Sequence, residues 1–184
     1  AGVGSQSQPL LTTKLYVPPP RPDWVARPRL LQRLDRGLTA RPDLVAPKLT
    51  LISAPAGYGK TTLVAAWAAQ AKQPVAWLSL DEGENDPARF LAYLTAALES
   101  LPELSLPADR ADRSMAAEAC LITLVNRISE LPGPAVLVLD DVHRVTAPSV
   151  HEIVRYLLDH LPSTLRLVIA TRADPPLPIA RLRA

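Results

Sequence analysis

The feature that most restricts the fold is the stretch LISAPAGYGKTTLVAAWAA at residues 51–69. An apolar run leads into a short turn with two glycines, and a second apolar segment follows the turn. Strand, glycine-rich turn and helix in this order predict a phosphate-binding loop of the Walker A type, because the amides of the turn and of the helix N-terminus point toward bound anions. The pattern G-x-x-x-x-G-K-[ST] is met at Gly59, Lys60 and Thr61, but Ala54 takes the place of its first glycine. Alanine is compatible with that position if its φ angle is negative, so we expect the loop to work.

Each residue type in this loop has a chemical role. Gly57 and Gly59 allow unusual φ angles and a close approach of the backbone to phosphate. Lys60 would neutralise the charge of the β- and γ-phosphates, and the hydroxyl of Thr61 would bind Mg²⁺. An ordinary tight turn between a strand and a helix is the alternative interpretation. The predicted cofactor-binding residues of the loop are Ala56, Gly57, Tyr58, Gly59, Lys60, Thr61 and Thr62.

Short apolar runs alternate with amphipathic segments along the rest of the chain. Four runs predict strands: 49–54, 75–79, 136–140 and 166–170. Apolar residues at spacings of three and four predict helices in five segments: 30–38, 61–71, 87–101, 114–131 and 149–161. A further helix is expected to begin within 177–184. Because the strands are unbroken apolar runs, we expect an α/β fold with a mostly parallel sheet and helices on both faces.

Two acids follow the third predicted strand, in VLVLDD. Asp140 would lie at the carboxyl end of that strand, in the Walker B position, and would meet the Mg²⁺ held by Thr61. Asp141 would orient or deprotonate a water molecule. Helix capping explains the two acids as well when they are considered alone. Arg172 ends the fourth strand and would contact the γ-phosphate there, or would instead pair with one of the two acids.

Several other residues favour structural roles. Helix capping or packing is the preferred interpretation for His143, and core packing is preferred for Trp67, Trp77 and Cys120. A single cysteine excludes a disulfide within the chain and is typical of a reducing cytoplasm. No apolar run approaches the roughly 18 residues of a membrane-spanning helix.

The chain of 184 residues suits one domain with three parts. Residues 1–13 are expected to be a loose tail or a tag remnant, and 14–48 a proline- and arginine-rich lead segment with one helix. The ATPase core would then occupy 49–184. The lead segment has eight Lys and Arg against three Asp, which indicates either a solvated helix face or a basic surface for phosphates. The net charge of +2 decides nothing about nucleic acid.

Taken together, these motifs resemble the STAND class of signal-transduction ATPases. More narrowly, they are similar to the amino-terminal ATPase domain of the MalT-like group of large ATP-binding LuxR-type transcription regulators. Five stretches carry the resemblance: TKLYVPPPRPDWVARPRLLQRL, APAGYGKTTLVAAWA, AWLSLDEGENDPARFLAYLTAAL, LVLDDVH and LVIATRADPPLPIARLRA. The third of these is the most specific to the family.

The resemblance implies an ATP- or ADP-binding switch domain of a bacterial transcription activator, with slow Mg²⁺-dependent hydrolysis. It also implies that Val25 and Arg27 contact the adenine, that ATP favours self-association of the parent protein, and that DNA is bound by a domain outside this chain. The implied P-loop NTPase sheet has the strand order 5-1-4-3-2, whose fifth strand would lie beyond Ala184. Two alternatives stay open, a small-molecule P-loop kinase and an interaction module whose degenerate loop binds no nucleotide.

Overall fold

One parallel sheet forms the centre of the molecule. The computed structural model describes residues 9–19, 25–38, 47–102, 104 and 117–177. Over these residues the four strands lie in the spatial order β1-β4-β3-β2, and every neighbouring pair is parallel. The strands are β1 (Leu49–Ser53), β2 (Val75–Ser79), β3 (Ala135–Asp140) and β4 (Leu165–Thr171). The α/β class and the order 1-4-3-2 expected from the sequence are confirmed, and each predicted strand is correct to within one residue at either end.

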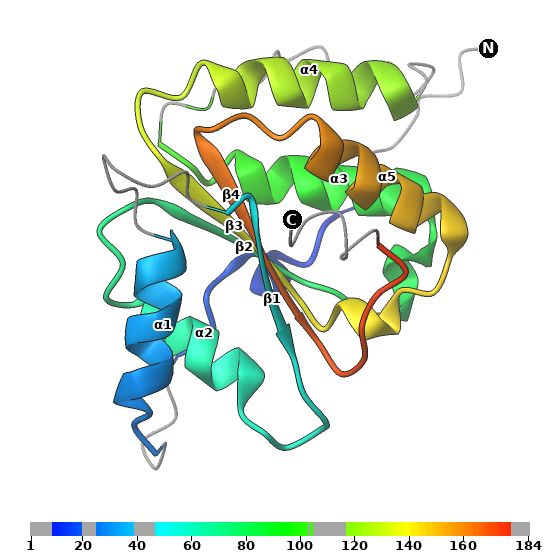
Figure 1. Ribbon diagram of the computed structural model, residues 1–184. Coiled ribbons are helices and arrows are strands. Elements are labelled where there is room, and N and C mark those ends of the chain that lie inside the picture. Colours follow the sequence, from blue (N-terminus) through cyan, green and yellow to red (C-terminus); the bar gives the residue numbers. More distant parts are fainter. Residues whose placement is uncertain (1–8, 20–24, 39–46, 103, 105–116, 178–184) are drawn as a thin grey trace, which may run out of the picture.

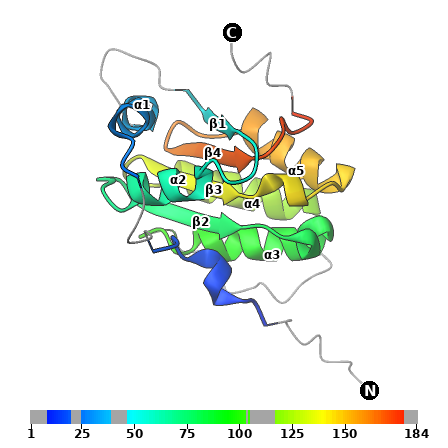
Figure 2. The same cartoon turned by 90° about the horizontal axis from the view of Figure 1, so that it is seen from below.

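The unbroken apolar runs form strands because helices cover both faces of the sheet. Every residue of the central strands β3 and β4 is buried. One face carries α1 (Pro28–Leu38) and α2 (Lys60–Ala68), and the other carries α3 (Pro87–Leu98), α4 (Ala117–Ser129) and α5 (Pro148–Asp159), as Figures 1 and 2 show. Alternate residues of each strand therefore enter two separate cores.

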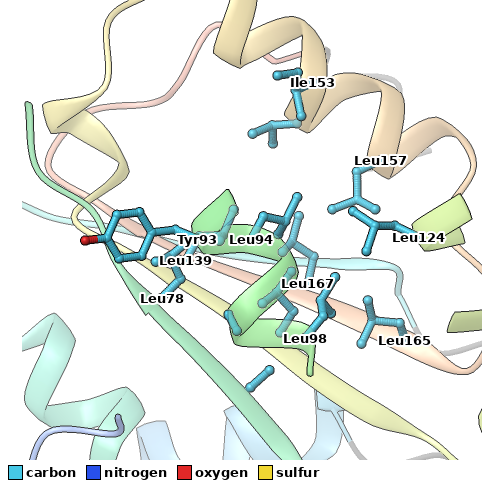
Figure 3. Packing of buried hydrophobic residues seen from close by; sticks show 14 of the residues in the cluster. Leu78, Tyr93, Leu94, Leu98, Leu124, Leu139, Ile153, Leu157, Leu165 and Leu167 are labelled. Carbon is cyan, nitrogen blue, oxygen red and sulfur yellow. The ribbon is translucent and has the colours of Figure 1, made fainter. Parts of the chain in front are cut away.

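The larger core lies between the sheet and helices α3, α4 and α5. Figure 3 shows leucines of β2, β3 and β4 packed against Leu94 and Leu98 of α3, Leu124 of α4 and Leu157 of α5. The smaller core contains Trp67 and Trp77, which are 3% and 1% exposed, so their predicted core role is confirmed. Cys120 is half-buried and packs against the rim of the larger core.

The five predicted helices are present; α1, α2 and α5 begin one or two residues earlier than expected, and α2, α3, α4 and α5 end two or three residues earlier. The helix predicted over 114–131 is described from Ala117, because 105–116 lie outside the described residues, as does most of the helix expected in 177–184. None of the described helices has the length and apolarity needed to cross a bilayer.

Three short 3-10 helices have no counterpart in the sequence prediction: η1 (Thr12–Leu15), η2 (Glu82–Asn85) and η3 (Val142–Arg144). The first of them begins inside the segment expected to be a loose tail. It contacts β2 and α3 (blue in Figure 2), and the amide of Leu11 donates to the hydroxyl of Tyr93 at 3.0 Å. Residues 9–13 therefore belong to the folded part of the chain.

Strand β1 lies at one edge of the sheet and pairs only with β4 among the described residues. Leu49 to Ile52 are half-buried and Ser53 is exposed, although the strand is as apolar as its neighbours. The helix η1 of the lead segment contacts β2 at the opposite edge of the sheet, and residues 20–24 of that segment lie outside the described residues.

Candidate nucleotide site

The loop between β1 and α2 has the backbone of a phosphate cradle. Gly57 and Gly59 have φ angles of 81° and 74°, which side-chain-bearing residues rarely adopt. Gly59 is the N-cap of α2, so the free amides of the first helical turn face the loop. Asp141 has the only positive φ among the described non-glycine residues, so Ala54 takes the position of the missing glycine without strain. The condition that the sequence analysis set for alanine at this position, a negative φ angle, is therefore met.

Lys60 is the first residue of α2, and its side chain folds back over the loop. Its Nζ donates to the carbonyl oxygens of Ala54 at 2.7 Å and Pro55 at 3.0 Å. The residue is 9% exposed, so the ammonium group is held inside the turn rather than in solvent. An ammonium group surrounded by backbone amides is the arrangement that binds the oxygens of a polyphosphate.

The two predicted metal ligands, Thr61 and Asp140, lie in hydrogen-bond contact. The hydroxyl of Thr61, on α2, donates to Oδ1 of Asp140, at the end of β3, over 3.1 Å, although 79 residues separate them. Asp140 is 3% exposed, and burial raises its pKa to about 6, with the nearby charge of Asp141 acting in the same direction. The hydrogen bond from Thr61 opposes this shift. A hydroxyl and one buried carboxylate beside a phosphate cradle fit Mg²⁺, which takes few protein ligands and completes its shell with phosphate and water.

Asp141 follows in a left-handed backbone conformation, with φ 58° and ψ 36°. Its amide donates to Oδ1 of Asp140 at 3.0 Å, which accounts for the sharp turn after the strand. Its own Oδ1 lies 3.7 Å from Nδ1 of His143, a buried nitrogen without a hydrogen-bond partner in the described part of the chain. Burial lowers the pKa of His143, and Arg172, Arg144 and Lys60 add to that effect against the charge of Asp141.

A polar cavity of about 510 Å³ adjoins this turn. It lies at the carboxyl ends of β2, β3 and β4, and its walls are Glu82, Asn85, His143, Arg144, Thr146 and Arg172. Arg172 is exposed, and no ion pair joins it to Asp140 or Asp141, both of which are described. The pairing alternative for Arg172 is therefore wrong. The side chain reaches the same cavity as the imidazole beside Asp141.

The residues expected near the adenine behave differently from one another. Arg27 lies at the loop, where its Nη1 donates to the carbonyl of Tyr58 at 2.8 Å. Val25 is 77% exposed, and no hydrogen bond, ion pair or core contact of the described residues links it to the loop. The structure thus joins Arg27 to the phosphate cradle and leaves Val25 beside it in solvent.

Sequence reasoning missed two groups of residues near the site. One is Asn85 with the other residues of η2, which the sequence analysis cited for the family resemblance and gave no separate role. The other is His143, whose cavity position the capping interpretation did not anticipate. Apart from that resemblance, the available signal was that DEGEN and DDVH each follow a buried strand, and the carboxyl ends of parallel strands meet at one edge.

Comparisons with known proteins agree with this geometry. The chain is 39% identical over 178 residues to the HTH-type transcriptional regulators MalT of Yersinia enterocolitica and Serratia proteamaculans, covering 95% of this chain and 19% of each relative. The chain thus spans about a fifth of the length of these curated relatives.

Two solved structures share the fold at 20% identity. Cdc6p from Pyrobaculum aerophilum has a TM-score of 0.59 and matches 91% of this chain and 44% of its own length. The Orc1 protein of Aeropyrum pernix, solved in complex with DNA, has a TM-score of 0.56 and matches 86% and 41%. A sequence model of the AAA ATPase domain matches residues 23–170. That match spans the loop, both acids, strands β1 to β3 and all of β4 but its last residue, and the chain therefore belongs to the AAA ATPase domain family.

Proposed function

We propose that this chain is an ATP- or ADP-binding switch domain that hydrolyses ATP slowly with Mg²⁺. The observation that carries the proposal is the hydrogen bond between Thr61 and Asp140 at the end of a cradle that already holds Lys60. A hydroxyl, a buried carboxylate and an ammonium group at one helix N-terminus are the groups that a Mg²⁺–polyphosphate complex requires.

Each site residue has a separate role in this proposal. The backbone of Ala56, Gly57, Tyr58 and Gly59, with the amides of Lys60, Thr61 and Thr62, binds the phosphates. Thr61 and Asp140 hold Mg²⁺, which supplies charge neutralisation at the β- and γ-phosphates. Asp141 orients the attacking water, and Arg172 contacts the γ-phosphate and so distinguishes ATP from ADP. Arg27 and Val25 lie on the adenine side of the loop.

The similarity to MalT supports a wider role for the parent protein. We propose that it is a bacterial transcription regulator in which this domain reports the bound nucleotide, and that ATP favours self-association. DNA would be bound by another part of that protein. The chain covers 19% of its MalT relatives, so this role extends beyond what the domain itself carries.

Calorimetric titration with ATP and ADP, with and without Mg²⁺, tests the proposal. Lys60→Ala should weaken binding of both nucleotides by about 2–4 kcal/mol, because it removes charge-assisted contacts to phosphate. Lys72→Ala is the matched control, since Lys72 is exposed beyond the other end of α2. Circular dichroism should show that both variants keep the secondary structure of the wild type.

Two outcomes would contradict the proposal. Equal nucleotide affinity in the wild type and Lys60→Ala would mean that the loop is not a phosphate site, as expected of a nucleotide-free interaction module. ATP-dependent phosphorylation of a small metabolite, detected as ADP accumulation that requires the acceptor, would favour the kinase alternative.

A further inference from the structure

The turn Asp81–Asp86 lies in the most family-specific stretch of the sequence, yet no nucleotide-binding role accounts for it. Within this turn, both the oxygen and the nitrogen of the Asn85 side-chain amide form hydrogen bonds. Its Oδ1 accepts from the amides of Thr146 and Ala147, each at 2.8 Å. Its Nδ2 donates to the carbonyls of Glu82 at 3.0 Å and Arg144 at 3.3 Å. One side chain of η2 therefore holds the backbone of a segment about 60 residues further along the chain.

That segment, residues 141–147, connects the two acids to α5. It begins with the left-handed Asp141, continues through η3 and ends at Ala147, the N-cap residue of α5. Alanine has no side chain that can cap a helix, and no side-chain cap is present at this N-terminus. Asn85 bonds the amides of Thr146 and Ala147, just before the helix begins, and so fixes the approach to α5 from a neighbouring element.

The turn that carries Asn85 is itself held by hydrogen bonds and ion pairs. Asp81 and Glu84 form a capping box, in which Oε2 of Glu84 accepts from the Asp81 amide at 2.8 Å. Glu84 is fully buried, and both of its oxygens accept from Nζ of Lys14, at 2.8 and 2.7 Å. Arg89 donates to the same carboxylate from α3 at 3.2 Å. Because the Asp81 and Glu84 carboxylates of this turn are both hydrogen-bonded, Asn85 extends from a well-supported turn.

His143, Arg144 and Thr146 of the held segment line the polar cavity, as do Asn85 and Glu82. His143 and Arg144 belong to that segment, and Asp141 begins it. A left-handed aspartate beside a buried, unpartnered imidazole nitrogen is a strained arrangement that persists only when its surroundings impose it. Among the described residues, Asn85 makes three of the side-chain hydrogen bonds to the backbone of the distal half of the segment, and His151 makes a further one to the Val145 carbonyl at 2.9 Å.

We propose that Asn85 is a positioning residue, which holds segment 141–147 so that His143 faces the cavity and Asp141 stays beside Asp140 and Thr61. The inference rests on the proposed function for its effect on catalysis. Its effect on the segment is independent of nucleotide. Asn85 touches neither the loop nor the two metal ligands, so it should influence the rate of hydrolysis and not the affinity for ADP.

The test compares three variants of this chain. Asn85→Leu keeps the size of the side chain and removes all of its hydrogen bonds. Asn85→Asp keeps the oxygen that accepts from Thr146 and Ala147, and asparagine and aspartate are equivalent as caps. Asn126→Leu makes the same chemical change at an exposed position of α4 and serves as the control. The measurements are steady-state ATP hydrolysis, calorimetric ADP affinity, and hydrogen exchange of the Thr146 and Ala147 amides without nucleotide.

Asn85→Leu should lower kcat at least about tenfold and leave KM for ATP and the Kd for ADP within about twofold, because it misplaces a catalytic group without touching the phosphate cradle. Asn85→Asp should restore most of kcat, and Asn126→Leu should match the wild type. An unchanged kcat in Asn85→Leu, or an equal loss in Asn85→Asp, would overturn the proposal.

Hydrogen exchange separates this inference from the proposed function. If the wild type neither binds nor hydrolyses ATP, the proposed function fails, whereas faster exchange at Thr146 and Ala147 in Asn85→Leu still supports the holding role. Unchanged exchange at those two amides would overturn it, whatever the nucleotide data show. If Asn85→Leu does not fold, the exchange and kcat of Asn85→Asp decide, because a holding role requires both to stay near the wild-type values.

Discussion

At the scale of single residues, Arg166 is a buried cation without a compensating group. It lies on β4, is 7% exposed, and its Nε and Nη1 have no hydrogen-bond partner in the described part of the chain. Burial lowers its pKa, and no nearby acid opposes that shift. Its neighbour in the sheet is Val136, so the guanidinium lies beside an apolar strand.

We predict that Arg166→Met stabilises the protein by about 1–2 kcal/mol, because a flexible apolar side chain of similar length replaces an uncompensated charge. Urea denaturation followed by circular dichroism would measure the change. Arg155→Met, at an exposed position of α5, is the control and should stay within about 0.5 kcal/mol of the wild type. Destabilisation by Arg166→Met would mean that the guanidinium has a partner beyond the described residues.

At the scale of elements, η1 is joined to η2 by a largely buried ionic contact. Nζ of Lys14 lies 2.7 Å from Oδ2 of Asp81 as well as contacting both oxygens of Glu84, and it lies 4.9 Å from the centre of the Tyr93 ring. The hydrogen bond from Lys14 lowers the pKa of Asp81 below its ordinary 3.8. Burial alone would lower the pKa of Lys14, but its bonds to Asp81 and Glu84 raise it above 10.5.

These shifts fix how a Lys14→Met variant should respond to pH. At pH 7 the variant should be less stable by about 3 kcal/mol, since it leaves a buried carboxylate with Arg89 as its remaining partner. The lowered pKa of Asp81 stabilises the folded protein above about pH 4, and this stabilisation disappears as the pH falls through the folded pKa. The raised pKa of Lys14 stabilises below about pH 10.5 and is lost as the pH rises further.

The difference in the free energy of unfolding between the wild type and Lys14→Met should therefore be largest between about pH 5 and 9, and it should become smaller below and above this range. Denaturation curves collected from pH 2 to 11 would measure it, with Lys48→Met, an exposed position, as the control. A difference that stays constant with pH would indicate that Lys14 contributes packing and no charge interaction.

Some features at this scale could be predicted from the sequence, and others could not. The strands could be predicted because burial on both faces requires unbroken apolar runs. The five helices could be predicted because a buried helix face requires apolar residues at spacings of three and four. The loop and Asp140 were readable because backbone and metal chemistry restrict the residue types there. Contacts such as Lys14 with Glu84, Arg27 with Tyr58 and Asn85 with Thr146 were not readable, because each joins segments that only the tertiary fold brings together.

At the scale of the whole molecule, the edge of the sheet that β1 forms has unpaired backbone groups. The Lys48 carbonyl and the Ala54 amide both bond to β4. Because alternate residues of a parallel strand face opposite sides, the amides of Thr50 and Ile52 also point toward β4, and those of Leu51 and Ser53 point away from the sheet. The described residues provide no acceptor for the outward pair.

We predict that the amides of Leu51 and Ser53 exchange with solvent much faster than those of Thr50 and Ile52, and that Val168 and Ile169 on the central strand β4 exchange slowest. Hydrogen exchange measured by NMR in dilute solution tests this order. Protection of Leu51 equal to that of Ile52 would show that another segment or a second copy covers the edge, as exposed apolar edges commonly recruit one. Protection that increases with protein concentration would identify the second copy.

The contact between Lys14 and Glu84 also determines the smallest part of the chain that can fold by itself. A chain shortened to begin at residue 16 would keep every residue assigned to the proposed nucleotide site. It would nevertheless bury the Glu84 carboxylate without the cation that lies 2.7 Å away. The unit that limited proteolysis should leave intact therefore extends upstream to about residue 10, well before the phosphate-binding loop.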